Sequence, residues 1–210
     1  MQKVHAVAEV RLVFKLKIVS WNVNSLRARE PIVEKLIKKE NPDILCIQEL
    51  KINDKEYVFN FFSSFGYSTF SQTQKSYNGV SFSNKKNIKV KDITFSNLNV
   101  EQARNNTILL DDYNIVIINN YFPNGNPIDT DKFPFKLKWM DSLYNEIKKL
   151  NQKYQIILTG DFNVIPKDED AHDIKKYRKD ALAQPETRKE FFKYLNLDLL
   201  DVFENQPKNQ

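Results

Sequence analysis

The chain has 210 residues, of which 41% are hydrophobic and 28% are charged, a balance typical of one sizeable globular domain and not of a disordered chain. No apolar run approaches the roughly 20 residues of a transmembrane helix, and charges scattered through residues 1–17 argue against a signal peptide. The net charge of +5 suits a polyanionic partner, and the single cysteine, Cys46, excludes an internal disulfide and fits a reducing cytoplasm.

The first half of the chain alternates strands with helices. A strand at 16–24 ends in polar residues, and Pro31 suits the first turn of the helix that follows. A short apolar strand is expected at 43–49, after which Asp54 can cap a second helix that stops near Gly66. The helical spacing predicts these buried residues: Ile32, Val33, Leu36 and Ile37 in the first helix, and Tyr57, Val58, Phe61, Phe62 and Phe65 in the second.

The second half begins with strands and returns to alternation. Strands are expected at 66–70, 78–84, 88–95, 107–112, 113–122 and 155–163. A long helix between the last two has an apolar face made of Phe135, Trp139, Met140, Leu143, Ile147 and Leu150. A final helix starts at Pro185. This order predicts a layered α/β protein with mixed sheets rather than a simple doubly wound one.

Four of the predicted strands end in polar clusters, and strand ends in layered α/β folds tend to form ligand crevices. The clusters are Trp21-Asn22-Val23-Asn24, Gln48-Glu49, Asn119-Asn120-Tyr121 and Gly160-Asp161-Phe162-Asn163. Carboxylate and amide oxygens are the ligands that Mg²⁺ prefers, and asparagine NH₂ groups can donate to a phosphate. Taken singly, such residues are more often turn formers, solvated charges or a core tyrosine. Four in one chain favour a site for phosphodiester cleavage, provided that they converge.

Five segments carry a resemblance to a known family. KIVSWNVNSLRAR, PDILCIQELK, YNGVSFS, YFPNGNP and LTGDFNVIP resemble, in order, the motifs of the exodeoxyribonuclease III group of the endonuclease/exonuclease/phosphatase superfamily. The resemblance covers roughly residues 16 to 203. It implies a four-layer α/β sandwich in which helices flank two mixed β-sheets, with the last strands missing. Residues 16–210 would form this domain, incomplete at its C-terminus, and residues 1–15 would be an N-terminal extension of unknown role.

The resemblance also implies roles for individual residues. Asn22, Glu49, Asp161 and Asn163 match positions that hold Mg²⁺, with Mn²⁺ as the possible substitute. Tyr121, Asp161 and Asn163 match catalytic positions, and Asp161 could either activate water or protonate the leaving oxygen. Substrate-binding roles are expected for Asn22, Lys51, Arg104 and Asn124. For Lys51 and Arg104, the alternative is a solvated surface charge.

One part of the family pattern is absent from the sequence. The family ends with a Ser-Asp-His segment whose histidine contacts the scissile phosphate, whereas the chain has only His5 and His172. His172 follows LTGDFNVIP and is expected to be a solvated loop residue. We therefore expect a C-terminally truncated chain that is inactive or strongly impaired, and only marginally stable. Loss of the last strand would bare the edge of the strand that carries Asn22.

The expected function is that of a metal-dependent DNA phosphodiesterase of base-excision repair. It would act as a 3′→5′ exonuclease and abasic-site endonuclease on double-stranded DNA, as a cytoplasmic monomer with no membrane partner. One alternative is a phosphatase-type relative with the same metal centre, against which the WNVNSLRAR and PNGNP segments argue. The other is a non-catalytic DNA-binding remnant or a partial gene product.

Overall fold

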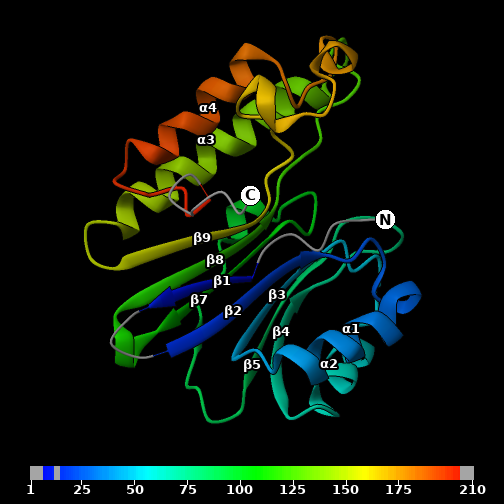
Figure 1. The fold of residues 1–210 in the computed structure, drawn as a ribbon, viewed down its shortest axis with the longest axis vertical. Coiled ribbons are helices and arrows are strands. Elements are labelled where there is room, and N and C mark those ends of the chain that lie inside the picture. Colours follow the sequence, from blue (N-terminus) through cyan, green and yellow to red (C-terminus); the bar gives the residue numbers. More distant parts are fainter. Residues whose placement is uncertain (1–6, 12–14, 204–210) are drawn as a thin grey trace. The chain divides into compact units, whose positions relative to one another are not determined.

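A computed structural model describes residues 7–11 and 15–203, which form two compact units. Unit 1 comprises the described residues up to Tyr121 together with Tyr154–Phe162. Unit 2 comprises Phe122–Lys153 and the described residues from Asn163 onward. Unit 1 contains the two β-sheets with helices α1 and α2, and unit 2 contains helices α3 and α4 (Figure 1).

The first sheet of unit 1, sheet A, has the order β1-β2-β3-β5-β4. Its strands are β1 (Val7–Arg11), β2 (Lys15–Asn22), β3 (Ile44–Gln48), β4 (Tyr67–Gln72) and β5 (Val80–Lys85). Strands β2 and β3 are parallel, whereas the other neighbours are antiparallel. Because β1 pairs with β2 over Lys15–Val19, the prediction of a bare edge is wrong for that stretch, and the covering strand comes from the N-terminal extension.

The second sheet of unit 1, sheet B, has the order β6-β7-β8-β9. Its strands are β6 (Lys91–Asp92), β7 (Asn105–Leu110), β8 (Ile115–Tyr121) and β9 (Gln155–Asp161). Only β8 and β9 run parallel. Both sheets are therefore mixed, as predicted. The strand predicted at 88–95 is reduced to the two residues of β6. Short 3₁₀ turns lie at Ser96–Leu98 and Asp111–Tyr113.

An apolar core fills part of the space between the two sheets. It includes Ile18, Cys46 and Phe82 from sheet A, and Ile108 and Ile117 from sheet B. Side chains alternate between the faces of a strand, so residues two positions further along point into the same space. On β2 and β8 those residues are Ser20 and Asn22, and Asn119 and Tyr121. The interior therefore changes from apolar to polar towards the carboxyl ends of these strands.

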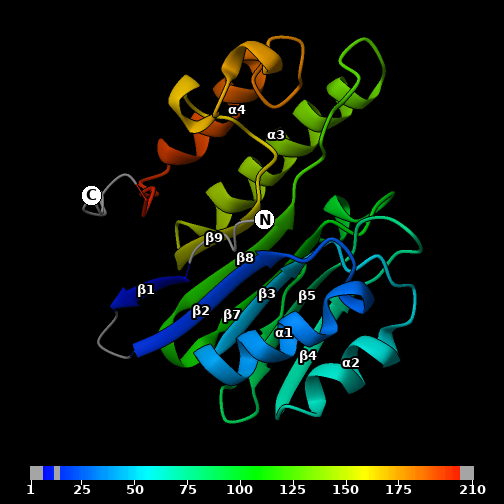
Figure 2. The same cartoon turned by 45° about the vertical axis from the view of Figure 1, so that its right-hand side comes forward.

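Helices α1 (Leu26–Glu40) and α2 (Lys55–Ser63) cover the outer face of sheet A, as both views show (Figure 2). Helix α1 begins five residues before Pro31, so the prediction that Pro31 occupies its first turn is wrong. Ile32 is 51% exposed, whereas Val33 and Ile37 are buried as predicted. The proline lies on the exposed side of the helix, where the loss of one backbone donor costs least.

Helix α2 begins as the sequence predicts. The Asp54 side chain accepts a hydrogen bond from the backbone N–H of Tyr57 at 3.0 Å, which caps the helix. Val58 and Phe62 are buried, and the other three residues of the predicted stripe pack against the same core while partly exposed. Gly66 has a φ of +85°, a left-handed conformation that suits glycine after a helix end.

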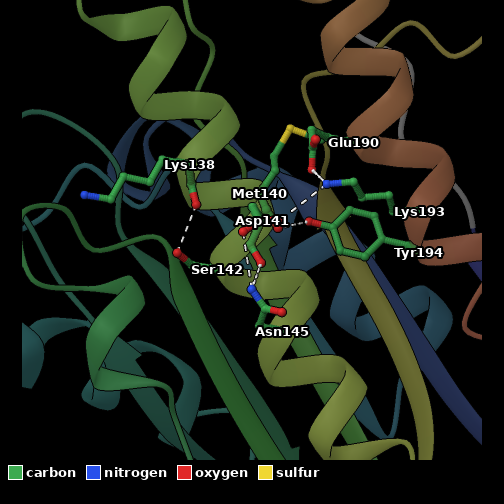
Figure 3. Close-up of polar contacts among 8 residues, drawn as sticks. All are labelled: Lys138, Met140, Asp141, Ser142, Asn145, Glu190, Lys193 and Tyr194. Atoms are coloured by element: carbon green, nitrogen blue, oxygen red, sulfur yellow. Dashed lines mark hydrogen bonds and ion pairs between the residues drawn. The ribbon is translucent and has the colours of Figure 1, made fainter.

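Unit 2 pairs helices α3 (Lys132–Leu150) and α4 (Pro185–Leu195). Pro185 stands in the first turn of α4, as predicted. The Tyr194 hydroxyl donates to the carbonyl of Met140 at 2.7 Å, and the Lys193 ammonium bridges Asp141 and Glu190 (Figure 3). Two 3₁₀ turns lie at Asp168–Asp170 and Ile174–Tyr177.

Among the described helices, none combines the length and apolar character that crossing a bilayer requires.

Candidate functional site

Four half-buried side chains meet at the polar rim of unit 1, where β2, β3, β8 and β9 end. Asn22 closes β2, Glu49 follows β3, and Tyr121 and Asp161 are paired across the last position of the parallel strands β8 and β9. Parallel strands present their carboxyl ends at one edge. The convergence that the sequence required is therefore present for these four residues.

The amide of Asn22 joins the two carboxylates. Its Nδ2 donates to Glu49 Oε1 at 2.8 Å and to Asp161 Oδ2 at 2.7 Å. Its Oδ1 accepts from the backbone N–H of Asn24 at 3.0 Å, which fixes the orientation of the amide. Two carboxylates from different sheets thus approach one nitrogen atom.

Glu49 lies among donors that favour its charged form. Burial raises the pKa of the Glu49 carboxyl, but hydrogen bonds from Asn22 and Lys51, together with the charge of Lys51, outweigh burial and leave the pKa below its ordinary value of 4.5. The Lys51 ammonium lies 2.9 Å from Glu49 Oε2. Glu49 also has a φ of +54°, which is uncommon for a residue other than glycine. The site therefore contains an ionised carboxylate on a strained backbone.

Tyr121 and Arg104 form a second pair at the rim. The Arg104 guanidinium lies over the Tyr121 ring, 4.8 Å from its centroid, and donates to the Tyr121 carbonyl at 3.0 Å. Burial lowers the pKa of Arg104 to about 10. Burial, together with the nearby charge of Glu49, raises the pKa of Tyr121, so its hydroxyl stays protonated. Arg104 is only 8% exposed, which excludes the alternative of a solvated charge.

Two further predicted residues, Asn124 and Asn163, lie together in unit 2. Asn124 Nδ2 is 3.5 Å from Asn163 Oδ1, and Asn163 Nδ2 donates to the Phe122 carbonyl at 2.9 Å. Beneath them lies Lys136 of α3, which is fully buried. Its ammonium donates to the carbonyls of Asn124 at 3.2 Å and of Asn163 at 2.5 Å. Lys136 therefore links the two loops that carry these asparagines.

The donors at the rim of unit 1 fit a divalent cation. Mg²⁺ typically binds one or two carboxylates and completes its shell with water and substrate phosphate. Glu49 and Asp161 provide two carboxylates close enough to share one donor, and Glu49 already pairs with a cation in Lys51. Within 7–11 and 15–203, no group of three or more His, Cys, Asp or Glu could hold a metal ion.

The sequence analysis did not predict the burial of three polar residues, two of them in unit 1 and one in unit 2. Gln48 and Asn119 were expected at the crevice, but both are buried between the sheets. Lys136 was not singled out, although it lies four residues before Met140 on the apolar face of α3. The helical period of 3.6 places Lys136 on the apolar face of α3 and could have signalled its burial. The strand period of two gives no such signal for Gln48 and Asn119, because it does not say which faces of the two sheets meet. His172, expected to be solvated, is exposed.

Residues 19–207 match the model of the endonuclease/exonuclease/phosphatase family, and the chain belongs to that family. It is similar to an exodeoxyribonuclease III of Haemophilus influenzae, with 34% identity over 74% of this chain. The match covers 60% of the length of the Haemophilus protein.

Two solved structures share the fold. An AP endonuclease from Archaeoglobus fulgidus superposes with a TM-score of 0.80 at 31% identity, over 90% of this chain and 73% of that one. A 3′ phosphatase from Neisseria, solved with a product DNA hairpin, superposes with a TM-score of 0.77 at 29% identity. That alignment covers 87% of this chain and 71% of the Neisseria chain.

Proposed function

We propose that the protein hydrolyses DNA phosphodiester bonds with a divalent cation, Mg²⁺ or Mn²⁺, in base-excision repair. The observation that carries the proposal is the Asn22 amide, which brings the Glu49 and Asp161 carboxylates together. A bound cation at these carboxylates would polarise the phosphate and stabilise the departing oxygen. The expected substrates are double-stranded DNA with abasic sites or 3′ ends, which matches the names of the related proteins.

The residues of the site have separate roles in this proposal. Glu49, kept ionised by its donors, is the main metal ligand, with Asn22 and Asp161 beside it. Arg104 and Lys51 supply positive charge for the phosphate, and Tyr121 supplies a protonated hydroxyl. Asn163 and Asn124 present amide groups from unit 2 for substrate contact. Asp161 either accepts the proton of the attacking water or protonates the leaving oxygen.

We also propose that the 210-residue chain turns over slowly. Among the described residues of unit 1 there is no histidine, the side chain that exchanges protons most readily near neutral pH. The raised pKa of Tyr121 makes its phenolate scarce at pH 7. Within unit 1, we therefore assign the transfer of a proton to or from water to Asp161.

A cleavage assay tests the proposed function. The purified chain is incubated with an end-labelled duplex that contains one abasic site, with Mg²⁺, with Mn²⁺ or with EDTA. We expect slow, metal-dependent incision at the abasic site, and loss of incision in Glu49→Gln and Asp161→Asn. Cleavage that persists in EDTA or in both variants contradicts the proposal. Salt-dependent DNA binding without cleavage by the unchanged chain would support the remnant hypothesis instead.

A second candidate activity is removal of 3′ phosphates from DNA. The Neisseria structure, described as a 3′ phosphatase with product DNA, favours it. The same site would serve, because both reactions attack phosphorus next to a 3′ oxygen. Rates on a 3′-phosphate duplex, an abasic duplex and an inositol phosphate separate the candidates. Turnover confined to the inositol phosphate would contradict both DNA reactions.

We further propose that residues 16–210 act as one functional domain, that the protein works as a monomer, and that it is located in the cytoplasm. Size-exclusion chromatography with light scattering checks the monomer. A mass of twice 24.8 kDa at micromolar concentration would contradict it.

A further inference from the structure

Two buried amides tie the sheets of unit 1 together directly behind the rim. Gln48 of β3 is 1% exposed and Asn119 of β8 is fully buried. Gln48 Nε2 donates to Asn119 Oδ1 at 2.6 Å. Asn119 Nδ2 donates onward to the carbonyls of Ile47 at 3.2 Å and Ser81 at 3.0 Å. One asparagine of sheet B is therefore hydrogen-bonded to two neighbouring strands of sheet A.

The Gln48 amide is also fixed within its own sheet. Its Nε2 lies 3.1 Å from Ser20 Oγ on β2 and 3.1 Å from the Cys46 carbonyl. A buried amide that loses its partners costs about 1–3 kcal/mol, so this arrangement strongly resists rotation of either side chain. We call Gln48 and Asn119 the amide clamp.

The amide clamp adjoins the residues whose geometry matters most. Gln48 directly precedes Glu49, whose left-handed φ of +54° persists only if the surrounding structure enforces it. Asn119 lies two residues before Tyr121, on the same face of β8. Glu49 is joined through the Asn22 amide to Asp161, which is the cross-strand neighbour of Tyr121 in the other sheet. The relative position of the sheets at this level therefore sets the position of Glu49 relative to Tyr121 and Asp161.

We propose that Gln48 and Asn119 are positioning residues that hold Glu49 in place for the divalent cation, a role that rests on the proposed function. Groups that orient a metal ligand without touching the metal change metal affinity or activity by 10- to 100-fold when they are replaced. The amide clamp reaches Glu49 directly along the chain from Gln48. It reaches Glu49 from the other sheet through β8, whose end is paired with Asp161, and through the Asn22 amide. Loss of the amide clamp should therefore weaken metal binding more than an equal loss of stability elsewhere in unit 1 does.

The chain offers a matched control in Asn106 of β7. Asn106 is fully buried and is the direct cross-strand partner of Asn119. It also links the two sheets, since its Oδ1 accepts from the Phe82 N–H at 2.9 Å and its Nδ2 donates to Thr94 Oγ1 at 3.0 Å. This link joins β7 to β5 and does not involve β3, which leads into Glu49. Replacing Asn106 removes a comparable buried amide and leaves the hydrogen bonds of Asn119 to Gln48 and to the Ile47 carbonyl in place.

The test compares Gln48→Met, Asn119→Leu and Asn106→Leu with the unchanged full chain. Urea unfolding reports stability, electron paramagnetic resonance titration reports Mn²⁺ affinity, and abasic-duplex cleavage gives KM and kcat. We expect all three variants to lose stability. Only Gln48→Met and Asn119→Leu should lower Mn²⁺ affinity 10- to 100-fold, with kcat falling and KM nearly unchanged. Equal loss of affinity in Asn106→Leu, or no loss in the clamp variants, overturns the proposal.

A metal-free measurement separates this proposal from the proposed function. The ring Cζ resonance of ¹³C-tyrosine reports the surroundings of the Tyr121 hydroxyl, including the charge of Glu49, and can be assigned with Tyr121→Phe. We expect it to move in Gln48→Met and Asn119→Leu, and to stay in place in Asn106→Leu. If the unchanged chain binds no Mn²⁺ but the three variants show these resonance shifts, the metal-dependent function is contradicted. The positioning role is then still supported. A resonance that does not move in either clamp variant contradicts the positioning role.

Discussion

Gly160 occupies the position on β9 directly beside Asn120 of β8, one residue before Asp161. Its φ is +134°, and a Cβ atom there would lie 1.9 Å from the Asn120 carbonyl oxygen. That contact is with backbone, which cannot move aside without breaking the pairing of β8 and β9. The close approach brings Tyr121 and Asp161 side by side at the rim, so the glycine serves the site as well as the sheet.

Gly160→Ala should therefore cost about 3–5 kcal/mol of unfolding free energy, because the clash adds to an unfavourable φ. Urea denaturation followed by circular dichroism measures the loss. Gly66→Ala is the comparison, since Gly66 also has positive φ but no atom lies within 4 Å of the position that an alanine Cβ would take there. It should cost only about 1 kcal/mol. Equal losses for the two variants would show that the contact with Asn120 is unimportant.

Lys136 gives a second prediction for a single residue. Replacing it with Met keeps the aliphatic length but removes the ammonium that donates to the Asn124 and Asn163 carbonyls. We expect a loss of about 1–3 kcal/mol in urea denaturation. Lys138→Met is the control, since Lys138 lies on the exposed side of the same helix, and a change there should stay within about 0.5 kcal/mol. Equal effects would contradict a specific role for the buried ammonium.

Among the strands, β4 is held to the turn before β3 by one tyrosine. Tyr67 is 2% exposed and donates to the Pro42 carbonyl at 2.6 Å. Burial, with the charge of Asp43 adding to it, raises the pKa of Tyr67 from 10 to about 12. The unfolded chain therefore loses this proton first as the pH rises. The stability that Tyr67 contributes is fully present below pH 10 and is lost between pH 10 and about pH 12.

Tyr67→Phe should accordingly destabilise the protein by about 1 kcal/mol at pH 8. The difference from the unchanged chain should shrink as the pH rises from 10 towards 12. Urea denaturation at pH 8, 9, 10 and 11 provides the comparison. Tyr77→Phe serves as the control, because Tyr77 is 70% exposed and its hydroxyl is in water in both states. A Tyr67→Phe difference that is constant with pH contradicts the assignment.

The elements that the sequence predicted well are those with strong local signals. The Asp54 cap, Pro185 at the start of α4 and the apolar run of β8 all depend on neighbouring residues alone. The start of α1 was missed because Ser25, which precedes it, makes no side-chain cap and has a left-handed φ of +87°. The shortness of β6 was missed because pairing with β7 decides it, and pairing is not a local property.

The site was predictable to a similar degree. Asn22, Glu49, Tyr121 and Asp161 could be expected together because their strands end in polar residues on one rim. The burial of Gln48 and Asn119 could not be foreseen from strand ends, since it depends on which faces of the two sheets meet. The grouping of Asn124 and Asn163 over Lys136 likewise depends on the packing of α3 against two loops.

For the whole molecule, metal binding should appear as thermal stabilisation. A ligand at about 100 times its Kd adds roughly 2.7 kcal/mol, which corresponds to about 5–10 °C for a chain of this size. We expect Mn²⁺ to raise the Tm of the unchanged chain by this amount in differential scanning fluorimetry. Combined Glu49→Gln and Asp161→Asn should abolish the rise. An equal rise in that variant would place the cation elsewhere in the molecule.

The space between the two sheets changes from apolar to polar, so the two ends of unit 1 differ: one is the rim that carries the candidate site, and the other is the opposite rim. The opposite rim carries the turn at Lys86 and Asn87 after β5, and the turn at Asn114 before β8, all exposed. A fluorophore, an affinity tag or a surface tether is best attached at those turns. The loop at Ser76 and Tyr77 is equally exposed, but it continues into Asn78, whose carbonyl accepts a hydrogen bond from the Lys51 N–H. A label attached to that loop would therefore disturb Lys51 and the Glu49 carboxylate beside it.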